Sequence, residues 1–510
     1  MGHHGRVLPL PQSDRRGLHR RHRPLLPRRG AGVLTEQTAI DLSSILRAQF
    51  GHKALRPLQQ RAIDRIMAGA DVLVIMPTGS GKSLCYQLPA LAQPQPGVTL
   101  VFSPLIALME DQVSALRKRG IRAQYINSTV PKAKREQRMS ALARGDYDLI
   151  YATPERMGRP GFAEALAQVP GGVKLLAVDE AHCVSRWGHD LRPAYQQIGQ
   201  FRRQLGNPPT IALTATATAA VRDDIRATLG ADRQSMPLVA APIDRPNLTL
   251  RVQEVWDDAA KLERIERLCA RSRGTGIIYF ALIKDLERFA DQLRRRLDRP
   301  IEIYHGQLDG RAKKRIYDRF IDAAPDDNLL LLATNAFGMG VDKPDIRFII
   351  HAQAPGSVEA YYQEVGRAGR DGEPSECLLL YAQDDLAIQR EFIEWMNPSA
   401  DLLVRAATAI EASGHADFDV DELILDVIGK RRCDRRLEYA IITLDKLGVI
   451  EPTSQPGRYR QARALDHDEI DPDEIAAKRQ RDLARLLDVV HLARSPDPAA
   501  FVRSYFDLDE

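Results

Sequence analysis

The chain has 510 residues and a net charge of only +4, from 72 basic and 68 acidic side chains. Its 44% apolar and 27% charged residues are ordinary for a soluble globular protein, and a length of about 100–200 residues per domain predicts about three domains. No apolar run reaches the roughly 18 residues that would span a bilayer, which excludes a membrane protein.

The charge is unevenly distributed along the chain. Residues 1–30 hold eight arginines against one acidic residue, whereas residues 401–510 hold 16 basic and 23 acidic residues. Residues 1–33 show no apolar periodicity, so we predict a disordered basic tail over residues 1–37 or a wrongly assigned start. A basic arm that touches phosphates and an organelle presequence remain alternatives. The overall charge alone therefore does not indicate a nucleic-acid partner.

From residue 38 to 240, short apolar runs alternate with stretches of helical spacing. Five runs read as buried strands, at 71–76, 97–103, 147–152, 173–179 and 210–215. A second series, within residues 241–395, gives strands at 274–280, 301–306, 328–334, 346–352 and 376–382. Continuous apolar strands that alternate with helices are typical of parallel sheets covered on both faces. The pattern predicts an α/β fold with two successive parallel-sheet domains.

A third region begins where the alternation of apolar strands and helices ends, near residue 395. The linker between the two α/β domains is predicted near Pro242 to Pro246, and residues 396–510 are expected to form a small separate module. Within it, residues 437–452 read as a helix followed by a short strand and a turn, which fits a winged helix or a small helical module.

The segment MPTGSGKS, residues 76–83, follows the first strand and opens a helix. Gly79 and Gly81 allow the backbone N–H groups to face a phosphate, and the helix N-terminus adds a favourable dipole. Lys82 would reach the β- and γ-phosphates and Ser83 would bind Mg²⁺. Met76 stands where the usual pattern has its first glycine. Thr78 and Ser80 complete the predicted ATP-binding loop.

A second strand ends in two carboxylates, Asp179 and Glu180. About 100 residues after a phosphate loop, this arrangement predicts that Asp179 holds Mg²⁺ and that Glu180 orients and deprotonates the attacking water. Thr214 and Thr216 follow a further strand, where their hydroxyls would couple nucleotide state to the neighbouring domain or simply cap a helix.

The second α/β domain has no phosphate loop, so it is not a second independent ATPase. Its segment YYQEVGRAGRDG carries Arg367 and Arg370, three residues apart and therefore on roughly the same side of a helix or turn. A guanidinium suits a γ-phosphoryl group better than an ammonium does. We predict that Gln363, Arg367 and Arg370 approach the nucleotide from this second domain.

These segments, together with LTATAT, DRPNL and ATNAFGMGVDKPDIRFIIH, resemble superfamily 2 helicases and specifically the RecQ DNA helicases, over residues 40–390. The extension CVSRWGHDLRPAY after the DEAH box resembles the aromatic-rich loop of RecQ proteins, whereas the DEAH box alone is shared with RNA helicases. The resemblance implies two tandem RecA-like domains that bind ATP between them.

The resemblance also assigns roles that the residues alone do not. Gln59, with Arg56, matches the motif that reads adenine, and His52 stands where many relatives have an aromatic residue that stacks on the base. In the aromatic-rich loop Leu191 replaces the usual phenylalanine. The residues that it places in coupling or along the single-strand track are Trp187, His189, Arg192, Ser103, Thr153, Thr214, His305 and Thr334.

The chain departs from many RecQ proteins after residue 395. Their four zinc-binding cysteines are represented only by Cys377 and Cys433, and zinc needs about four nitrogen or sulfur ligands. We therefore predict no structural zinc and a short form without an HRDC domain. The basic cluster at 430–436 would either touch duplex phosphates or form a solvated helix face.

The predicted function is an ATP- and Mg²⁺-dependent DNA helicase. The resemblance implies that it moves 3′ to 5′ on single strands and unwinds forked or tailed duplexes in DNA repair and recombination. Five cysteines without a C-x-x-C pair fit a reducing cytoplasm, where the protein would act at the nucleoid. An RNA helicase of the DEAH type, and an ATPase that translocates or anneals without unwinding, remain alternatives.

Overall fold

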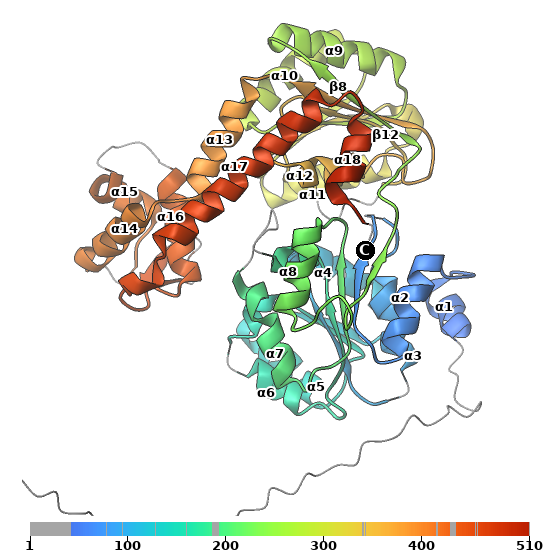
Figure 1. The fold of residues 1–510 in the computed structure, drawn as a ribbon, viewed down its shortest axis with the longest axis vertical. Helices are drawn as coiled ribbons and strands as arrows, with labels where there is room; N and C mark the ends of the chain where they lie inside the picture. The colour runs from blue at the N-terminus through green and yellow to red at the C-terminus, as the bar shows by residue number, and fades with distance from the viewer. Residues whose placement is uncertain are drawn as a thin grey trace, which may run out of the picture. The chain divides into compact units, whose positions relative to one another are not determined.

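The computed structural model describes residues 42–510 with gaps at 78, 94, 128, 160, 186–192, 339–340, 342, 415–416, 429–434, 454, 456 and 509–510. The predicted basic tail lies outside these residues. The described chain forms two parallel sheets covered by helices, which we call the first and second lobes, and a further group of helices with a small hairpin (Figure 1). No helix in this part of the chain is long and apolar enough to cross a membrane.

The sheet of the first lobe has seven strands in the order β3-β4-β2-β5-β6-β1-β7, and every pair is parallel. The strands are β1 Val72–Ile75, β2 Val98–Phe102, β3 Ala123–Ile126, β4 Leu149–Ala152, β5 Val173–Val178, β6 Thr210–Thr214 and β7 Leu238–Ala240. The five predicted strands are all present. The sequence missed β3 and β7 because they are short strands at the two edges of the sheet, without a long apolar run.

Two core clusters lie on the two faces of this sheet. Leu73 and Ile75 belong to one cluster, and Val72 and Val74 to the other, because successive residues of a strand point to opposite faces. Burial on both faces explains the continuous apolar runs. The covering helices are α1 Leu42–Phe50, α2 Pro57–Met67, α3 Leu84–Ala92, α4 Ile106–Lys118, α5 Lys132–Ala143, α6 Phe162–Ala167, α7 Ile198–Gln204 and α8 Ala219–Thr228.

The sheet of the second lobe has six parallel strands in the order β10-β11-β9-β12-β13-β8. They are β8 Leu248–Glu254, β9 Thr275–Tyr279, β10 Ile301–Tyr304, β11 Leu330–Ala333, β12 Ile346–His351 and β13 Ser375–Tyr381. The covering helices include α9 Asp258–Arg271, α10 Ile283–Arg296, α11 Gly310–Asp322 and α12 Val358–Val365. The sequence missed β8, an edge strand without a fully buried residue.

Beyond the second sheet, α13 Asp385–Met396 leads to a compact unit with its own core. This unit holds α14 Ala400–Ser413, α15 Val420–Ile428, α16 Arg435–Lys446 and the antiparallel hairpin β14 Ile450–Pro452 with β15 Tyr459–Gln461. An isolated bridge joins Phe418 to Tyr459 ahead of α15. Three helices followed by a hairpin, with this extra bridge, form the order of elements of a winged helix, and the helix and strand expected within 437–452 are both present.

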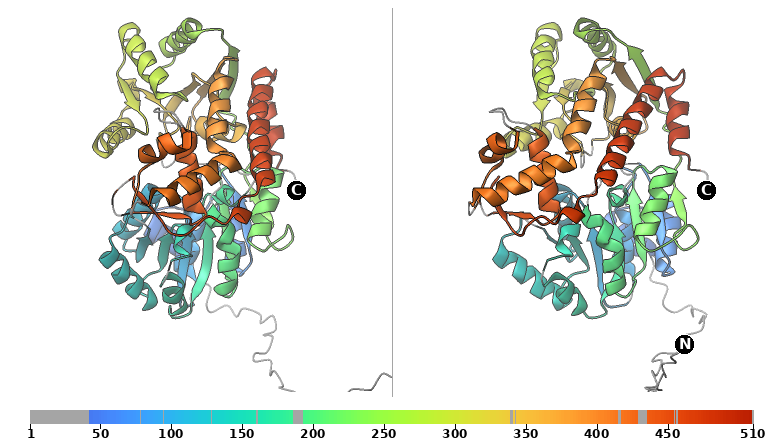
Figure 2. Two further views of the ribbon diagram at one scale, coloured as in Figure 1. Left: turned by 90° about the vertical axis from the view of Figure 1, so that its left-hand side faces the viewer. Right: turned by 60° about the vertical axis from the view of Figure 1, so that its left-hand side comes forward.

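The last two helices lie outside this compact unit, although the sequence predicted a single module over residues 396–510. α17 Pro472–Arg494 runs back beside α13 (Figure 2), and α18 Pro498–Phe506 contacts β8. Val489, Leu492, Val502 and Phe506 join the core of the second lobe. This compact unit is therefore preceded by α13 and followed by α17 and α18, which return to the second lobe. Composition did not reveal this return, because a helix with one apolar face can be rich in charge and still pack.

The end of α18 also reaches the first lobe. Arg222 of α8 is only 1% exposed, and its Nη1 donates to the carbonyl oxygens of Ala217, at 3.2 Å, and Phe506, at 3.0 Å. Leu508 packs against the core of the first lobe. Arg503 pairs at 2.9 Å with Asp244, in the connection between β7 and β8. The C-terminal helix thus contacts both lobes and the connection between them.

Candidate functional site

The loop between β1 and α3 has the conformation that its sequence predicts. Gly79 and Gly81 both have positive φ, +77° and +82°, which side-chain-bearing residues rarely adopt. Ser83 occupies the N-cap of α3. The Lys82 ammonium donates to the carbonyl oxygen of Met76 at 3.1 Å and so folds over the start of the loop. Thr78 lies outside the described residues.

Gln59 and Arg56, expected at the adenine, hold the phosphate loop in this structure. The Gln59 amide donates to the carbonyl oxygens of Ser80, at 3.2 Å, and Gly81, at 3.1 Å, while Arg56 Nη1 donates to Ser80 at 3.1 Å. The Gln59 side-chain oxygen accepts the Arg56 N–H at 2.9 Å, at the start of α2. His52 is exposed just after α1. Sequence reasoning did not anticipate this support of the loop.

Asp179 and Glu180 follow β5 directly. Burial, reinforced by the neighbouring Glu180 carboxylate and opposed by Lys82, raises the pKa of Asp179 to about 7. Asp179 Oδ1 accepts the Glu180 N–H at 3.0 Å. A bound divalent cation would relieve the crowding of these two carboxylates, and oxygen donors are the ligands that Mg²⁺ prefers. The residues present therefore fit the predicted magnesium site.

Glu180 is the start of a chain of polar contacts that crosses between the lobes. It has a left-handed backbone, φ +48°, and its Oε2 lies 3.3 Å from His182 Nδ1. The same imidazole nitrogen is 3.0 Å from Thr214 Oγ1, which donates to the Thr216 carbonyl at 3.0 Å. The Thr216 hydroxyl accepts from the Gln363 amide of α12 at 3.4 Å. His182 is the link that sequence reasoning missed, although it stands in the quoted DEAH box.

The two arginines after α12 occupy different places. Arg367 is buried in the second lobe and donates to the carbonyl oxygen of Gly338. Arg370 donates to Val341 at 2.6 Å, and its Cδ lies 2.9 Å from where a Cβ on Gly79 would stand. Only Arg370 therefore touches the phosphate loop of the first lobe, although the spacing had predicted that both would approach it.

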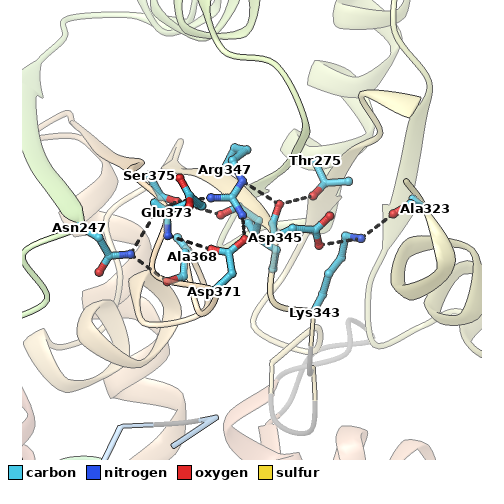
Figure 3. A network of polar contacts seen from close by, with 12 residues as sticks. Asn247, Thr275, Ala323, Lys343, Asp345, Arg347, Ala368, Asp371, Glu373 and Ser375 are labelled. Carbon is cyan, nitrogen blue, oxygen red and sulfur yellow. Dashed lines mark hydrogen bonds and ion pairs between the residues drawn. The ribbon is translucent and has the colours of Figure 1, made fainter. Parts of the chain in front are cut away.

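The loop that carries these arginines is fixed by a polar network (Figure 3). Arg347 pairs with Asp371 and donates to the Asp345 carbonyl at 3.2 Å, while the buried Lys343 pairs with Asp345 at 3.0 Å. Asn247 donates to the carbonyl oxygens of Gly369, at 2.8 Å, and Glu373, at 3.0 Å.

Arg245 adds to this support from the connection between the lobes. It donates to the carbonyl oxygens of Ala368, at 3.0 Å, and Gly369, at 2.9 Å. Arg245 and Asn247 belong to the quoted DRPNL segment, which the sequence left without a role. Their target lies more than 120 residues later, so no local pattern could assign it.

Comparison with known proteins places this arrangement in a family. Residues 56–225 match the DEAD/DEAH box helicase model and residues 260–372 the helicase conserved C-terminal domain. The probable ATP-dependent DNA helicase RecS of Bacillus subtilis is 39% identical over 369 residues, covering 72% of each chain. The ATP-dependent DNA helicase RecQ of the same organism is 44% identical over 353 residues. The chain belongs to the RecQ family of DNA helicases.

The match does not extend over the full length of these relatives. The chain covers 58% of the B. subtilis RecQ and 53% of the Pasteurella multocida RecQ, so it spans little more than half of these proteins. Among solved structures, the helicase MrfA bound to DNA is 20% identical with a TM-score of 0.57, over 86% of this chain and 61% of that chain. Saccharomyces cerevisiae Dbp5 bound to RNA is 18% identical with a TM-score of 0.52, over 68% and 90%. At these identities the structures show the fold alone.

Four residues that the RecQ resemblance places on the single-strand track share one position in the fold. Ser103, Thr153, His305 and Thr334 are each the first residue after a strand, β2, β4, β10 and β11 respectively. They therefore lie at the carboxyl edges of the two parallel sheets, where open α/β sheets bind ligands. All four are largely buried, and Ser103 Oγ and His305 Nδ1 have no hydrogen-bond partner among the described residues.

The remaining predicted residues divide into two groups. Thr214 is fully buried and its hydroxyl is used inside the lobe, so it is suited to coupling and not to direct contact with DNA. Trp187, His189 and Arg192 lie outside the described residues, as does the basic cluster up to residue 434.

The thiols of the described cysteines are not arranged as metal ligands. Cys377 is buried in the second sheet, and burial raises the pKa of its thiol to about 12. Cys433 lies in a gap of the described chain. Within the described ranges no group of three or more His, Cys, Asp or Glu side chains could hold a metal ion. The predicted magnesium site is of another kind, because it combines Ser83 and Asp179 with the phosphates of ATP.

Proposed function

We propose that the protein is an ATP-dependent DNA helicase that moves 3′ to 5′ on single-stranded DNA and unwinds forked or tailed duplexes, in DNA repair and recombination at the nucleoid. The contact between Arg370 of the second lobe and Gly79 of the first is the observation that carries this proposal. It supports a nucleotide site built from both lobes, so that hydrolysis can change how the lobes sit along a strand.

The first lobe would bind the nucleotide. The phosphates would lie against the N–H groups of residues 78–83, with Lys82 released from the Met76 carbonyl to reach the β- and γ-phosphates. Ser83 and Asp179 would hold Mg²⁺, which neutralises charge on the phosphate oxygens during transfer. His52, Arg56 and Gln59 would face the base, and Gln59 would report occupancy to the loop through its bonds to Ser80 and Gly81.

The chemistry would use residues of both lobes. Glu180 would take a proton from the attacking water, while Arg370, and Arg367 after closure, would stabilise charge on the γ-phosphoryl group. Gln363 already contacts Thr216 at 3.4 Å. The contacts from Glu180 through His182 and Thr214 to Gln363 are therefore the route by which hydrolysis would change the fit between the lobes.

The strand itself would run along the carboxyl edges of the two sheets. Ser103 and Thr153 in the first lobe, and His305 and Thr334 in the second, would contact it, and the segment with Trp187, His189 and Arg192 would couple its binding to hydrolysis. Affinity for such a strand would be mostly electrostatic and would fall with salt.

ATP hydrolysis measured with single-stranded DNA, duplex DNA and RNA tests the proposal. We expect strong stimulation by single-stranded DNA, and unwinding of duplexes with a 3′ tail and not of those with a 5′ tail. Lys82→Ala should abolish both activities while DNA binding persists. Equal stimulation by RNA would instead favour an RNA helicase, and hydrolysis without strand separation would favour a translocating or annealing ATPase.

A further inference from the structure

A groove opens at the carboxyl edge of the second sheet. Its volume is about 840 Å³, within the range of about 300–1,000 Å³ that ligand sites occupy. One wall is formed by residues that follow β9, β11 and β12, three neighbouring strands, and includes Phe280, Thr334 and Gln353. Thr334 also belongs to the proposed strand track, so the groove continues that track.

The opposite wall comes from α13 and α16, which contact each other and lie beyond the second sheet (Figure 1). Phe392 and Trp395 lie on α13 with their ring centroids 5.2 Å apart, and the Arg435 guanidinium of α16 lies 4.9 Å from the Trp395 centroid. Met396 beside them is 40% exposed. This wall lies at and beyond the end of the 260–372 helicase match and so is not part of that motif set.

The charges around the groove suit a polyanion. Two of its acidic side chains already have partners, because Glu364 lies 2.8 Å from the His351 imidazole and Asp482 accepts from Lys478 at 2.9 Å and Arg485 at 3.1 Å. A third, Glu287, lies 3.8 Å from His305.

The groove's Lys284 and Arg435, by contrast, form no ion pair with any described residue. Aromatic faces beside cations that have no acidic partner are the combination that holds unpaired bases and their phosphates.

We propose that this aromatic wall is a base-stacking subsite, in which Phe392, Trp395 and Arg435 hold unpaired nucleotides of the strand as it crosses the second lobe. Lys284 and Arg435 would contact the phosphates. The proposal rests on the proposed function, because it extends the same single-strand track. A single strand is favoured over an apolar peptide because the groove continues from Thr334 and carries two cations, Lys284 and Arg435, that pair with no described acid.

The test compares two tryptophans of one chain. Trp395→Ala removes the stacking face, Trp395→Phe keeps an aromatic ring, and Trp256→Ala is the control, since Trp256 is 80% exposed and does not line the groove. The dissociation constant for a fluorescein-labelled oligo(dT) strand is measured by anisotropy. A stacked base contributes about 1–3 kcal/mol, so Trp395→Ala should weaken binding about 5- to 150-fold, while Trp395→Phe and Trp256→Ala stay near wild type.

Two further readouts separate stacking from a fold defect. A single abasic site, scanned along the strand, should weaken wild-type binding at one position and have no added effect there in Trp395→Ala. The DNA concentration that half-stimulates ATP hydrolysis should rise in Trp395→Ala and stay near that of the wild type in Trp395→Phe, which keeps an aromatic ring. Lys284→Ala should lower the salt slope of binding by about 0.7, the value for one phosphate contact on a single strand.

The outcomes distinguish this inference from the function on which it rests. If single-stranded DNA stimulates the wild type but Trp395→Ala binds the strand as Trp256→Ala does, the stacking subsite is overturned and the helicase proposal stands. An equal abasic penalty in wild type and Trp395→Ala would have the same meaning. If the wild type neither binds single-stranded DNA nor hydrolyses ATP in its presence, both proposals fail together.

Discussion

The two lobes have the same parallel architecture but hold their functional residues in different ways. In the first lobe the phosphate loop is held by neighbours in sequence, since Gln59 and Arg56 bond to Ser80 across 21 and 24 residues. In the second lobe the arginine loop, which carries Arg367 and Arg370, is held by a residue distant in sequence, since Arg245 donates to the Gly369 carbonyl across 124 residues. A phosphate-binding loop can thus be held by residues close to it in sequence. Side chains that must reach the other lobe are positioned by contacts that only the whole fold creates.

The difference matters because the proposed nucleotide site draws on both lobes. Arg370 reaches Gly79, and Gln363 reaches Thr216, so the second lobe contributes its charge through one loop and one helix. An error of about 1 Å in that loop would misplace the guanidinium relative to the γ-phosphoryl group, and such misplacement can cost about a hundredfold in rate. Substitutions in the first lobe and in the second lobe can therefore be tested separately.

Arg370→Ala should have the largest effect on the rate. An arginine that stabilises a transferring phosphoryl group is worth on the order of 10³–10⁵ in kcat, so single-turnover ATP hydrolysis should fall by that factor while nucleotide affinity changes little. Arg370→Lys should recover only part of the rate, because an ammonium lacks the planar fork. Arg315→Ala, an exposed arginine of α11, is the control and should hydrolyse ATP at the wild-type rate. A normal rate in Arg370→Ala would remove this residue from the site.

Glu180→Gln tests the first lobe in the same assay. Loss of a general base lowers rates by about 10²–10⁴-fold, and the glutamine keeps the size of the side chain. We therefore expect a protein that binds ATP and single-stranded DNA, hydrolyses at that reduced rate and does not unwind. Glu136→Gln, an exposed acid on α5, provides the matched control. Unwinding at the wild-type rate in Glu180→Gln would contradict the proposed role.

Asp385→Asn tests a long-range contact that orders the second lobe. Lys261 of α9 pairs with Asp385 at the start of α13 at 2.7 Å, and the two side chains are only 5% and 7% exposed. Removing one partner of a buried pair leaves the other charge uncompensated, at a cost of about 3–5 kcal/mol.

Chemical denaturation gives this loss as a fall in the free energy of unfolding. The control is Asp318→Asn, which removes the exposed pair with Lys314 and should cost less than about 1 kcal/mol. Equal losses in the two variants would show that burial of the Lys261–Asp385 pair contributes nothing.

The same contrast explains what could be predicted from sequence. The apolar runs of the central strands and the turn of Gly79 and Gly81 follow from local chemistry, and the structure confirms them. The sequence did not predict the edge strands β3, β7 and β8, because half-exposed or very short strands lack a continuous apolar run. The sequence also did not predict that α17 and α18 pack back on the second lobe, because helical periodicity identifies an apolar face and not the element that covers it.

The site divides in the same way. Lys82 and Asp179 were each assigned from a short motif of consecutive residues, and their surroundings fit those roles. The link through His182 to Thr214 spans 32 residues, and the bonds of Asn247 span more than 120. Such contacts depend on which strands become neighbours in the sheet, and one sequence does not encode that order in any short pattern.

Arg347→Ala gives the smallest expected effect and tests the comparison most directly. Arg347 touches neither the phosphate loop nor the nucleotide, but its pair with Asp371 fixes the residue after Arg370. As a positioning residue it should lower kcat about tenfold, or 1.4 kcal/mol, with the KM for ATP nearly unchanged. Arg347→Lys should restore part of the rate, because an ammonium can still pair with Asp371. In Arg370→Ala the additional Arg347→Ala change should cost little more, since the misplaced group is already absent. Full additivity in that double variant would mean that Arg347 acts on stability alone, and that the arginine loop keeps its position without the long-range network.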